Sequence, residues 1–462
     1  MKLWEQICVG LLLLSAAPLS LWSQVDNPRT PPVPAVTGTE NTDNTDNRML
    51  TPPLVSGQSY PTSPTSEERS NYLRGGLAFT SAYTDNAVGP VNGHPESDVS
   101  FSVAPFVALD ETTSRQHCVL TYAPGFTFYQ RESYLNEADQ NASINFQYRV
   151  APHATLTARD GFQKSSSVFN QPDLASAETV SGGAQVPNFS VIAPIADRLS
   201  NSGNLGITYQ FAANEMVGAS GTFVNLHYPN SAEVPGLFDS SSQAGSVFYT
   251  FRASKMHYLG VTYQYQRLVS NPSEGRDETQ THAVLFFYTL YPTPRFSISL
   301  FGGPQYSDTV QPPLTPSQLQ ASPLRAWTPA AGASLSWQGR LNSLAVSYAH
   351  VISGSGGLFG AVHMDSASAS IRQQIMRSLS GTLAGGYAQN DVLGSVLLQG
   401  NNGHTVSGTA SLQRQFGEHI NLQLGYTRLH QDYSNVPVLS LTPDTNREFI
   451  SVSYQFSRPM GR

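Results

Sequence analysis

The chain has 462 residues, of which 12% are charged, and its formal net charge is −7. A soluble domain usually has about twice that share of charged residues, and the sequence carries no basic patch of the kind that binds nucleic acid. Beyond residue 22, apolar runs are much shorter than the roughly 20 residues that a membrane-spanning helix needs. Low charge without such helices favours a β-barrel in a membrane, where lipid-facing and pore-facing residues alternate.

The N-terminal part of the chain is predicted to lie outside the folded domain. Residues 1–23 have the pattern of a secretory signal peptide, with Lys2 ahead of the apolar stretch Ile7–Trp22. Residues 24–71 contain eight prolines and the tandem TDNTDN, so we expect a disordered periplasmic leader that cannot bury an apolar face. Cys8 falls in the signal, which leaves Cys118 alone and excludes an intramolecular disulfide.

From Tyr72 onward, segments of about a dozen residues alternate apolar and polar side chains, as strands with one apolar face do. Clear examples start at Leu205, Leu259, Ile420 and Ile450. Strands are predicted to begin near residues 72, 97, 115, 140, 153, 202, 216, 243, 256, 278, 294, 325, 341, 362, 378, 403, 419 and 447.

Short and long connectors alternate strictly between these segments, as they do in outer-membrane barrels with periplasmic turns and external loops. The sequence therefore predicts an all-β fold, a transmembrane antiparallel up-and-down β-barrel of about eighteen strands over residues 72–462. Both ends of the barrel would lie on the short-turn, periplasmic side. A count of sixteen follows if one hairpin is misread. A large secreted all-β protein is the alternative, but it gives no reason for the alternating connectors.

The last predicted strand places Val452, Tyr454 and Phe456 at two-residue spacing. This resembles the terminal assembly signal of Gram-negative outer-membrane barrels, which implies recognition by the barrel-assembly machinery and a membrane containing lipopolysaccharide. The tail Ser457–Arg462 departs from that pattern, because the usual signal ends on the aromatic residue itself.

The first third of the domain also resembles porin-like barrels found beside exopolysaccharide gene clusters. The resemblance rests on residues 82–86, 103–105, 121–129 and 150–154, together with Asn141, Leu156 and Asp160. It covers about a hundred residues. The resemblance implies a porin-like channel. Its cargo would then be either small polar solutes or a polysaccharide strand.

The sequence offers no catalytic, metal-binding or cofactor-binding motif. The eleven histidines are scattered, and glycine pairs fit strand kinks better than phosphate cradles. His282 lies in an apolar strand, where we interpret it as an interface or lumen residue. We therefore expect no enzyme and no cofactor.

The residues that alternate with the apolar ones in each strand, called here the polar parity, would line the pore. They are mostly Ser, Thr, Asn, Gln and Gly. Their few charges are mostly cationic, which would favour anions in a water-filled channel. The pore-lining candidates are Arg149, Arg159, Gln210, Arg252, Gln264, Arg372 and Gln413.

The longest connector, residues 163–201, is the third external loop in order and is unusually apolar. We expect Phe169, Phe189, Ile192 and Ile195 to fold into the barrel mouth and constrict it, because free apolar side chains would avoid water. A small hairpin on the rim is the alternative. The sequence leaves three functions in order: a porin-like channel, an adhesive or structural barrel with a blocked lumen, and, last, a barrel enzyme. It leaves the oligomeric state open.

Overall fold

The computed structural model describes residues 71–87, 95–165, 197–229, 238–271, 275–293, 295–310, 323–354, 360–393, 402–433 and 443–459. The expected signal peptide, nearly all of the expected leader and the four constriction residues Phe169, Phe189, Ile192 and Ile195 lie outside these ranges. No helix within them is long and apolar enough to cross a membrane. One 3₁₀ turn, η2, spans Ser133–Leu135.

Almost all of the described residues lie in β-strands. The strands are β1 Asn71–Thr84, β2 Asp98–Thr112, β3 Gln116–Tyr122, β4 Gly125–Tyr129, β5 Glu137–Ala151, β6 Ala154–Ser165, β7 Arg198–Ala212, β8 Glu215–His227, β9 Asp239–Arg252, β10 His257–Asn271, β11 Asp277–Thr293, β12 Phe296–Val310, β13 Pro323–Gln338, β14 Asn342–Gly354, β15 Ala361–Met376, β16 Leu379–Val392, β17 Gly403–Phe416, β18 Ile420–Tyr433 and β19 Asp444–Pro459.

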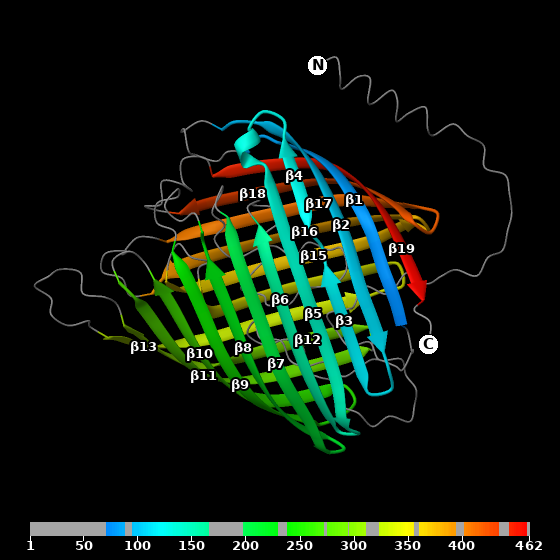
Figure 1. The fold of residues 1–462 in the computed structure, drawn as a ribbon. Helices are drawn as coiled ribbons and strands as arrows, with labels where there is room; N and C mark the ends of the chain where they lie inside the picture. The colour runs from blue at the N-terminus through cyan, green and yellow to red at the C-terminus, as the bar shows by residue number, and fades with distance from the viewer. Residues whose placement is uncertain are drawn as a thin grey trace, which may run out of the picture. The chain divides into compact units, whose positions relative to one another are not determined.

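The strands form one closed antiparallel sheet, in which each pairs with its neighbours in sequence and β19 pairs with β1 (Figure 1). β3 and β4 pair with the same two strands in one unbroken register, and Pro124 separates them. Because proline has no N–H to donate, it interrupts the ladder without ending the strand. Counted as one strand, β3 and β4 give an 18-stranded barrel, which confirms the predicted fold class.

The strands are strongly tilted. A walk around the barrel through successive paired residues returns to β1 displaced by about 22 residues. At about 3.3 Å per residue and 4.8 Å between strands, this shift corresponds to a tilt of about 40° and a backbone radius of about 18 Å. A barrel of that size has room for an aqueous lumen.

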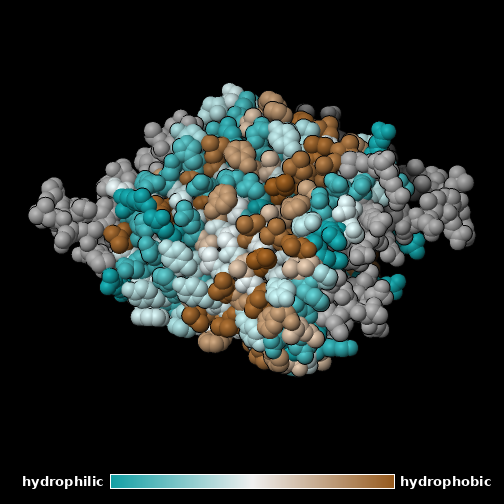
Figure 2. Space-filling model, turned by 60° about the horizontal axis from the view of Figure 1, so that its bottom comes forward, coloured by the Kyte–Doolittle hydropathy of each residue, from teal (hydrophilic) through white to brown (hydrophobic). Residues whose placement is uncertain are grey.

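The apolar parity of the strands faces outward. In β7, Leu205 is 58% exposed, whereas its neighbour Thr208 on the other parity is buried. Figure 2 shows hydrophobic side chains running across the middle of one face with hydrophilic ones on either side. Exposed aromatic residues lie at mid-wall, among them Phe79, Phe286 and Tyr348, and at two levels nearer the strand ends. Near the short turns these are Tyr209, Phe211, Phe251, Trp337, Phe416, Tyr454 and Phe456, and near the long loops Tyr83, Phe101, Phe128, Trp327 and Tyr387.

Several aromatic rings lie flat on a glycine that is their partner across the ladder. A Cβ added at Gly260, for example, would overlap the Phe287 ring and the Tyr249 carbonyl. The pairs are Gly75–Phe456, Gly76–Phe106, Gly203–Phe223, Gly218–Phe248, Gly260–Phe287, Gly332–Phe301, Gly403–Tyr433 and Gly425–Phe449. Glycine thus lets large rings lie along the wall instead of projecting from it, and the rings cover backbone that glycine leaves bare.

Candidate functional site: the barrel lumen

The structure places all seven predicted pore residues on the inward parity. They come from seven strands: Arg149 on β5, Arg159 on β6, Gln210 on β7, Arg252 on β9, Gln264 on β10, Arg372 on β15 and Gln413 on β17. Their role in conduction stays a prediction.

Inward arginines gather in the half of the barrel nearer the short turns. Arg252 donates to the side chain of Asn214 at 3.1 Å and to the carbonyl of Ala213 at 2.8 Å, which fixes it at the rim. Arg74 donates to Asp110 at 3.0 Å, and His117 lies 3.4 Å from the same carboxylate. The inward charged residues of this half are Arg74, Asp110, Arg149, Arg159, Arg252 and Arg372.

The inward charges of the long-loop half have the opposite balance. They are Asp98, Glu137, Asp139, Arg198, Asp277 and Arg447. Near the short turns, the described inward charges are five arginines and one aspartate. Near the long loops, they are four carboxylates and two arginines. The interior is therefore polarised along its axis, positive at one end and negative at the other.

On the side of β15–β18, the interior is much more enclosed near the long loops than near the short turns. In β18 the inward residues Leu429, Gln431 and Tyr433 are buried, whereas Asn421 and Gln423 are half-exposed. β15 and β17 follow the same gradient, and Gln413 at the short-turn end is exposed. On this side of the barrel the short-turn half is thus open and narrows toward the long loops. On the side of β8–β12, inward residues near the short turns are buried as well, among them Met216, Tyr258, Thr289 and Ser299.

Part of this narrowing comes from an apolar contact across the lumen. Leu268 of β10 packs with Ile352 of β14, Ala361 of β15 and Leu393 beside β16. Three strands separate β10 from β14, or roughly 19 Å of wall from one to the other. Such a contact needs the long-loop ends of β14–β16 to bend inward against the inner face of β10. The sequence analysis missed this apolar closure, defined here as Leu268, Ile352, Ala361 and Leu393.

An arc of the inner wall is aromatic. Met216, Phe248, Tyr258 and Phe287 form one buried cluster across β8–β11, and Tyr291 and Phe301 pack against it. The signal for this arc is present in the sequence, because Phe286-Phe287-Tyr288 places aromatic rings on both parities at once. On the same side Thr262 is 0% exposed and donates to the carbonyl of Val247. Neither Thr262 nor the buried Gln264 is therefore a wet position of the kind Gln413 occupies.

Six of the ten described histidines lie on the outward parity toward the long loops: His227, His282, His350, His363, His404 and His430. The other four, His117, His153, His257 and His419, lie near the short turns. His282 accepts or donates a hydrogen bond at 2.8 Å with the Tyr263 hydroxyl and stacks among Tyr265 and Tyr306. His350 lies 2.9 Å from Asp365 on the same outer level. Among the described residues, no group of three or more His, Cys, Asp or Glu side chains is placed to hold a metal ion.

No protein-family model matches the chain. No curated protein matches it either. Solved structures that resemble it include OpdQ of Pseudomonas aeruginosa, with 11% identity, 84% of this chain and 99% of that chain covered, and a TM-score of 0.40. OccAB4 of Acinetobacter baumannii has 10% identity, with 85% and 100% covered and a TM-score of 0.41. OpdK of Pseudomonas aeruginosa has 10% identity, with 84% and 99% covered and a TM-score of 0.39. Likenesses this low carry no functional argument, so the function must be inferred from the chain's own geometry.

Proposed function

We propose that the protein is a porin-like channel of the bacterial outer membrane that passes small polar solutes and prefers anions. The observation that carries this is the polarised interior. Its short-turn half has five inward arginines and one inward aspartate, it is open along β15–β18, and the outward parity of the surrounding wall is apolar. An 18-stranded barrel leaves an aqueous lumen, and inward cations favour anions.

The setting follows from the outer wall. An apolar band between two aromatic levels suits lipid, and an exposed apolar surface of this extent would not be stable in water. Val452, Tyr454 and Phe456 all lie outward on β19, where the assembly machinery could read them. Outer-membrane lipid, lipopolysaccharide and the barrel-assembly machinery are thus the proposed partners, with the short turns and both barrel ends on the periplasmic side.

Ion selectivity in planar bilayers tests the proposal. The quadruple change Arg149→Gln, Arg159→Gln, Arg252→Gln and Arg372→Gln should move the reversal potential in a tenfold KCl gradient toward cation selectivity. Arg414→Gln is the matched control, because Arg414 lies on the outward parity of β17 beside the Phe416 ring. A reversal potential that responds equally to both changes would refute the proposed pore lining.

A structural or adhesive barrel with a blocked lumen is the second candidate. Burial of the inward residues in the long-loop half favours it, since a solute would have to pass the apolar closure there. Absence of single-channel conductance in wild type and in closure variants would select it. A polysaccharide strand, the other cargo considered, would need a wider opening than a small solute, so its passage requires the closure to move.

A further inference from the structure

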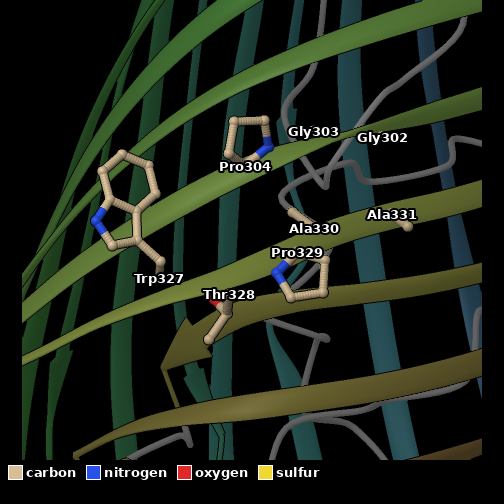
Figure 3. Close-up of a pocket in the computed structure, with 8 residues that line it drawn as sticks. All are labelled: Gly302, Gly303, Pro304, Trp327, Thr328, Pro329, Ala330 and Ala331. Atoms are coloured by element: carbon tan, nitrogen blue, oxygen red, sulfur yellow. The ribbon is translucent and has the colours of Figure 1, made fainter.

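Two prolines stand opposite each other in the wall. Pro304 of β12 and Pro329 of β13 are direct partners in the β12–β13 register, and Figure 3 shows their rings close together beside the Trp327 indole. The β12–β13 ladder continues without a break through this pair. The amide donors that proline lacks are therefore missing from the two outer sides of the hairpin, toward β11 and toward β14.

Both outer ladders fail at this level. Between β11 and β12, ladder pairs are present at Ala283–Gln305 and at Phe286–Gly302 in one register, and the two positions between them are unpaired. Between β13 and β14 the pairs stop at Ala331–His350, although both strands continue. Across the described parts of these strands, residues 323–330 of β13 have no ladder partner in residues 351–354 of β14. We call this interval the β13–β14 seam.

The end of β14 turns away from β13 and into the barrel. Val351 packs against the interior cluster of Ala283, Leu285 and Ala330, and Ile352 reaches Leu268 across the lumen. Val351 thus contacts Ala330 of β13 through its side chain, although the two strands have no ladder pair at this level. The inner side of the seam is therefore apolar.

The β12–β13 hairpin beside the seam carries an open apolar notch of about 510 Å³, lined by residues of these two strands. Its lining includes Gly302, Pro304, Trp327, Pro329 and Ala331, and Trp327 is 72% exposed (Figure 3). Ala330 belongs both to the notch lining and to the interior cluster, so apolar surface runs from the outside of the wall to its inside.

Polar groups at the notch are few and specifically placed. The hydroxyl of Thr328 is buried and has no hydrogen-bond partner among the described residues. Two residues from Trp327 toward the long loops, Arg325 lies on the same outward parity and donates to Asp308 at 3.1 Å. Arg325 remains well exposed, so its guanidinium can also meet an anionic group at the membrane surface.

We propose that the β13–β14 seam is a lateral portal through which a single-chain amphipathic carboxylate passes between the surrounding lipid and the lumen. The acyl chain lies in the notch against Trp327 and Pro329, and the carboxylate lies near Arg325. This inference rests on the proposed channel function, because a portal needs a lumen that leads onward.

Tryptophan quenching tests the binding step. Trp337→Phe leaves Trp327 as the reporter. Trp327→Phe leaves Trp337, on the same strand and parity near the short turns, as the matched control. Trp4 and Trp22 belong to the expected signal peptide, so the mature barrel is expected to hold only these two tryptophans. Brominated palmitate should quench Trp327 saturably and Trp337 only in proportion to its bulk concentration. Arg325→Gln should weaken binding of the brominated carboxylate at least fivefold. It should leave binding of the brominated alcohol of equal chain length unchanged. Equal, unsaturable quenching of both tryptophans would make the notch ordinary lipid contact and overturn the proposal.

Channel block tests passage. In a Cys118→Ser background, Thr328→Cys with Ser353→Cys, joined by a bifunctional maleimide, should close the seam. Ser334→Cys with Ser347→Cys, paired in the intact part of the same ladder, is the control. Membrane-delivered palmitate should block ion current reversibly in wild type and in the joined control, and not in the joined seam variant, whose own conductance persists. Pro329→Val, which restores a donor toward β14, should reduce the block without a cross-link.

Two failures are distinguishable. If palmitate blocks the ion current of the cross-linked seam variant as strongly as that of wild type, the portal proposal is overturned and the channel proposal stands. A wild-type barrel that carries no current overturns the channel and the portal together, and saturable quenching of Trp327 would then define a lipid-binding notch alone.

Discussion

Two adjacent residues of β18 give a direct test of which face meets lipid. Leu424 points outward and is 45% exposed, and Gln423 points inward. Leu424 is four residues above Ile420, which at about 3.3 Å per residue and a tilt of about 40° places it ~10 Å from the short-turn end. That depth is near the middle of an apolar band about 25 Å tall.

An arginine at mid-depth on the lipid face costs about 2–4 kcal/mol, whereas a half-exposed lumen position is wet. Leu424→Arg should therefore lower the free energy of unfolding by about 2–4 kcal/mol, and Gln423→Arg by less than about 1 kcal/mol. Guanidinium titration of the barrel in phospholipid vesicles measures both, with heat-modifiable gel mobility as the check on folding. Equal losses at the two positions would refute the assigned parity.

Three further predictions concern the wall and the pore. Deleting residues 168–195, between the described ends of β6 and β7, should leave the barrel folded, since every described ladder pair remains. It should raise single-channel conductance if that connector constricts the mouth. Leu268→Ser should raise conductance by loosening the apolar closure, and an unchanged current would count against a constriction there. Gly260→Ala should cost about 1–3 kcal/mol of stability because the new methyl group overlaps the Phe287 ring, whereas Gly408→Ala, where a Cβ meets nothing within 4 Å, should cost less than about 0.5 kcal/mol; denaturant midpoints compare them.

The strands could be predicted closely because the information for them is local. Alternation fixes parity within a few residues, and connector length fixes which end is which. The predicted start near 419 corresponds to Ile420, and the start near 140 to Glu137, within three residues. The seven pore candidates lie on the inward parity in the structure, and their place in the conduction path stays a prediction.

The shape of the lumen could not be predicted in this way, because it depends on contacts between distant strands. Leu268 and Ile352 alternate like ordinary strand residues, and nothing local says that β14 bends to bring them together. Pro304 and Pro329 are separate strand prolines in the sequence, and only the register makes them partners. The alternation pattern predicts that the Thr262 hydroxyl faces water, but the structure buries Thr262 on the side of the barrel that holds the aromatic arc.

The pairing of β1 with β19 sets the order in which the wall can be completed. Most ladders join residues a few tens of positions apart, but this one runs from Tyr72–Pro459 to Thr84–Arg447. Near its long-loop end, the backbone N–H of Asn446 donates to the carboxylate of Asp85 at 2.7 Å. Bringing such distant segments together carries the largest loop-closure entropy of any ladder, so we expect it to form last. Until then the nascent sheet has two free edges with unpaired amides, each a template for a foreign strand. A chain truncated within β19 should therefore associate edge to edge with other copies instead of closing on itself.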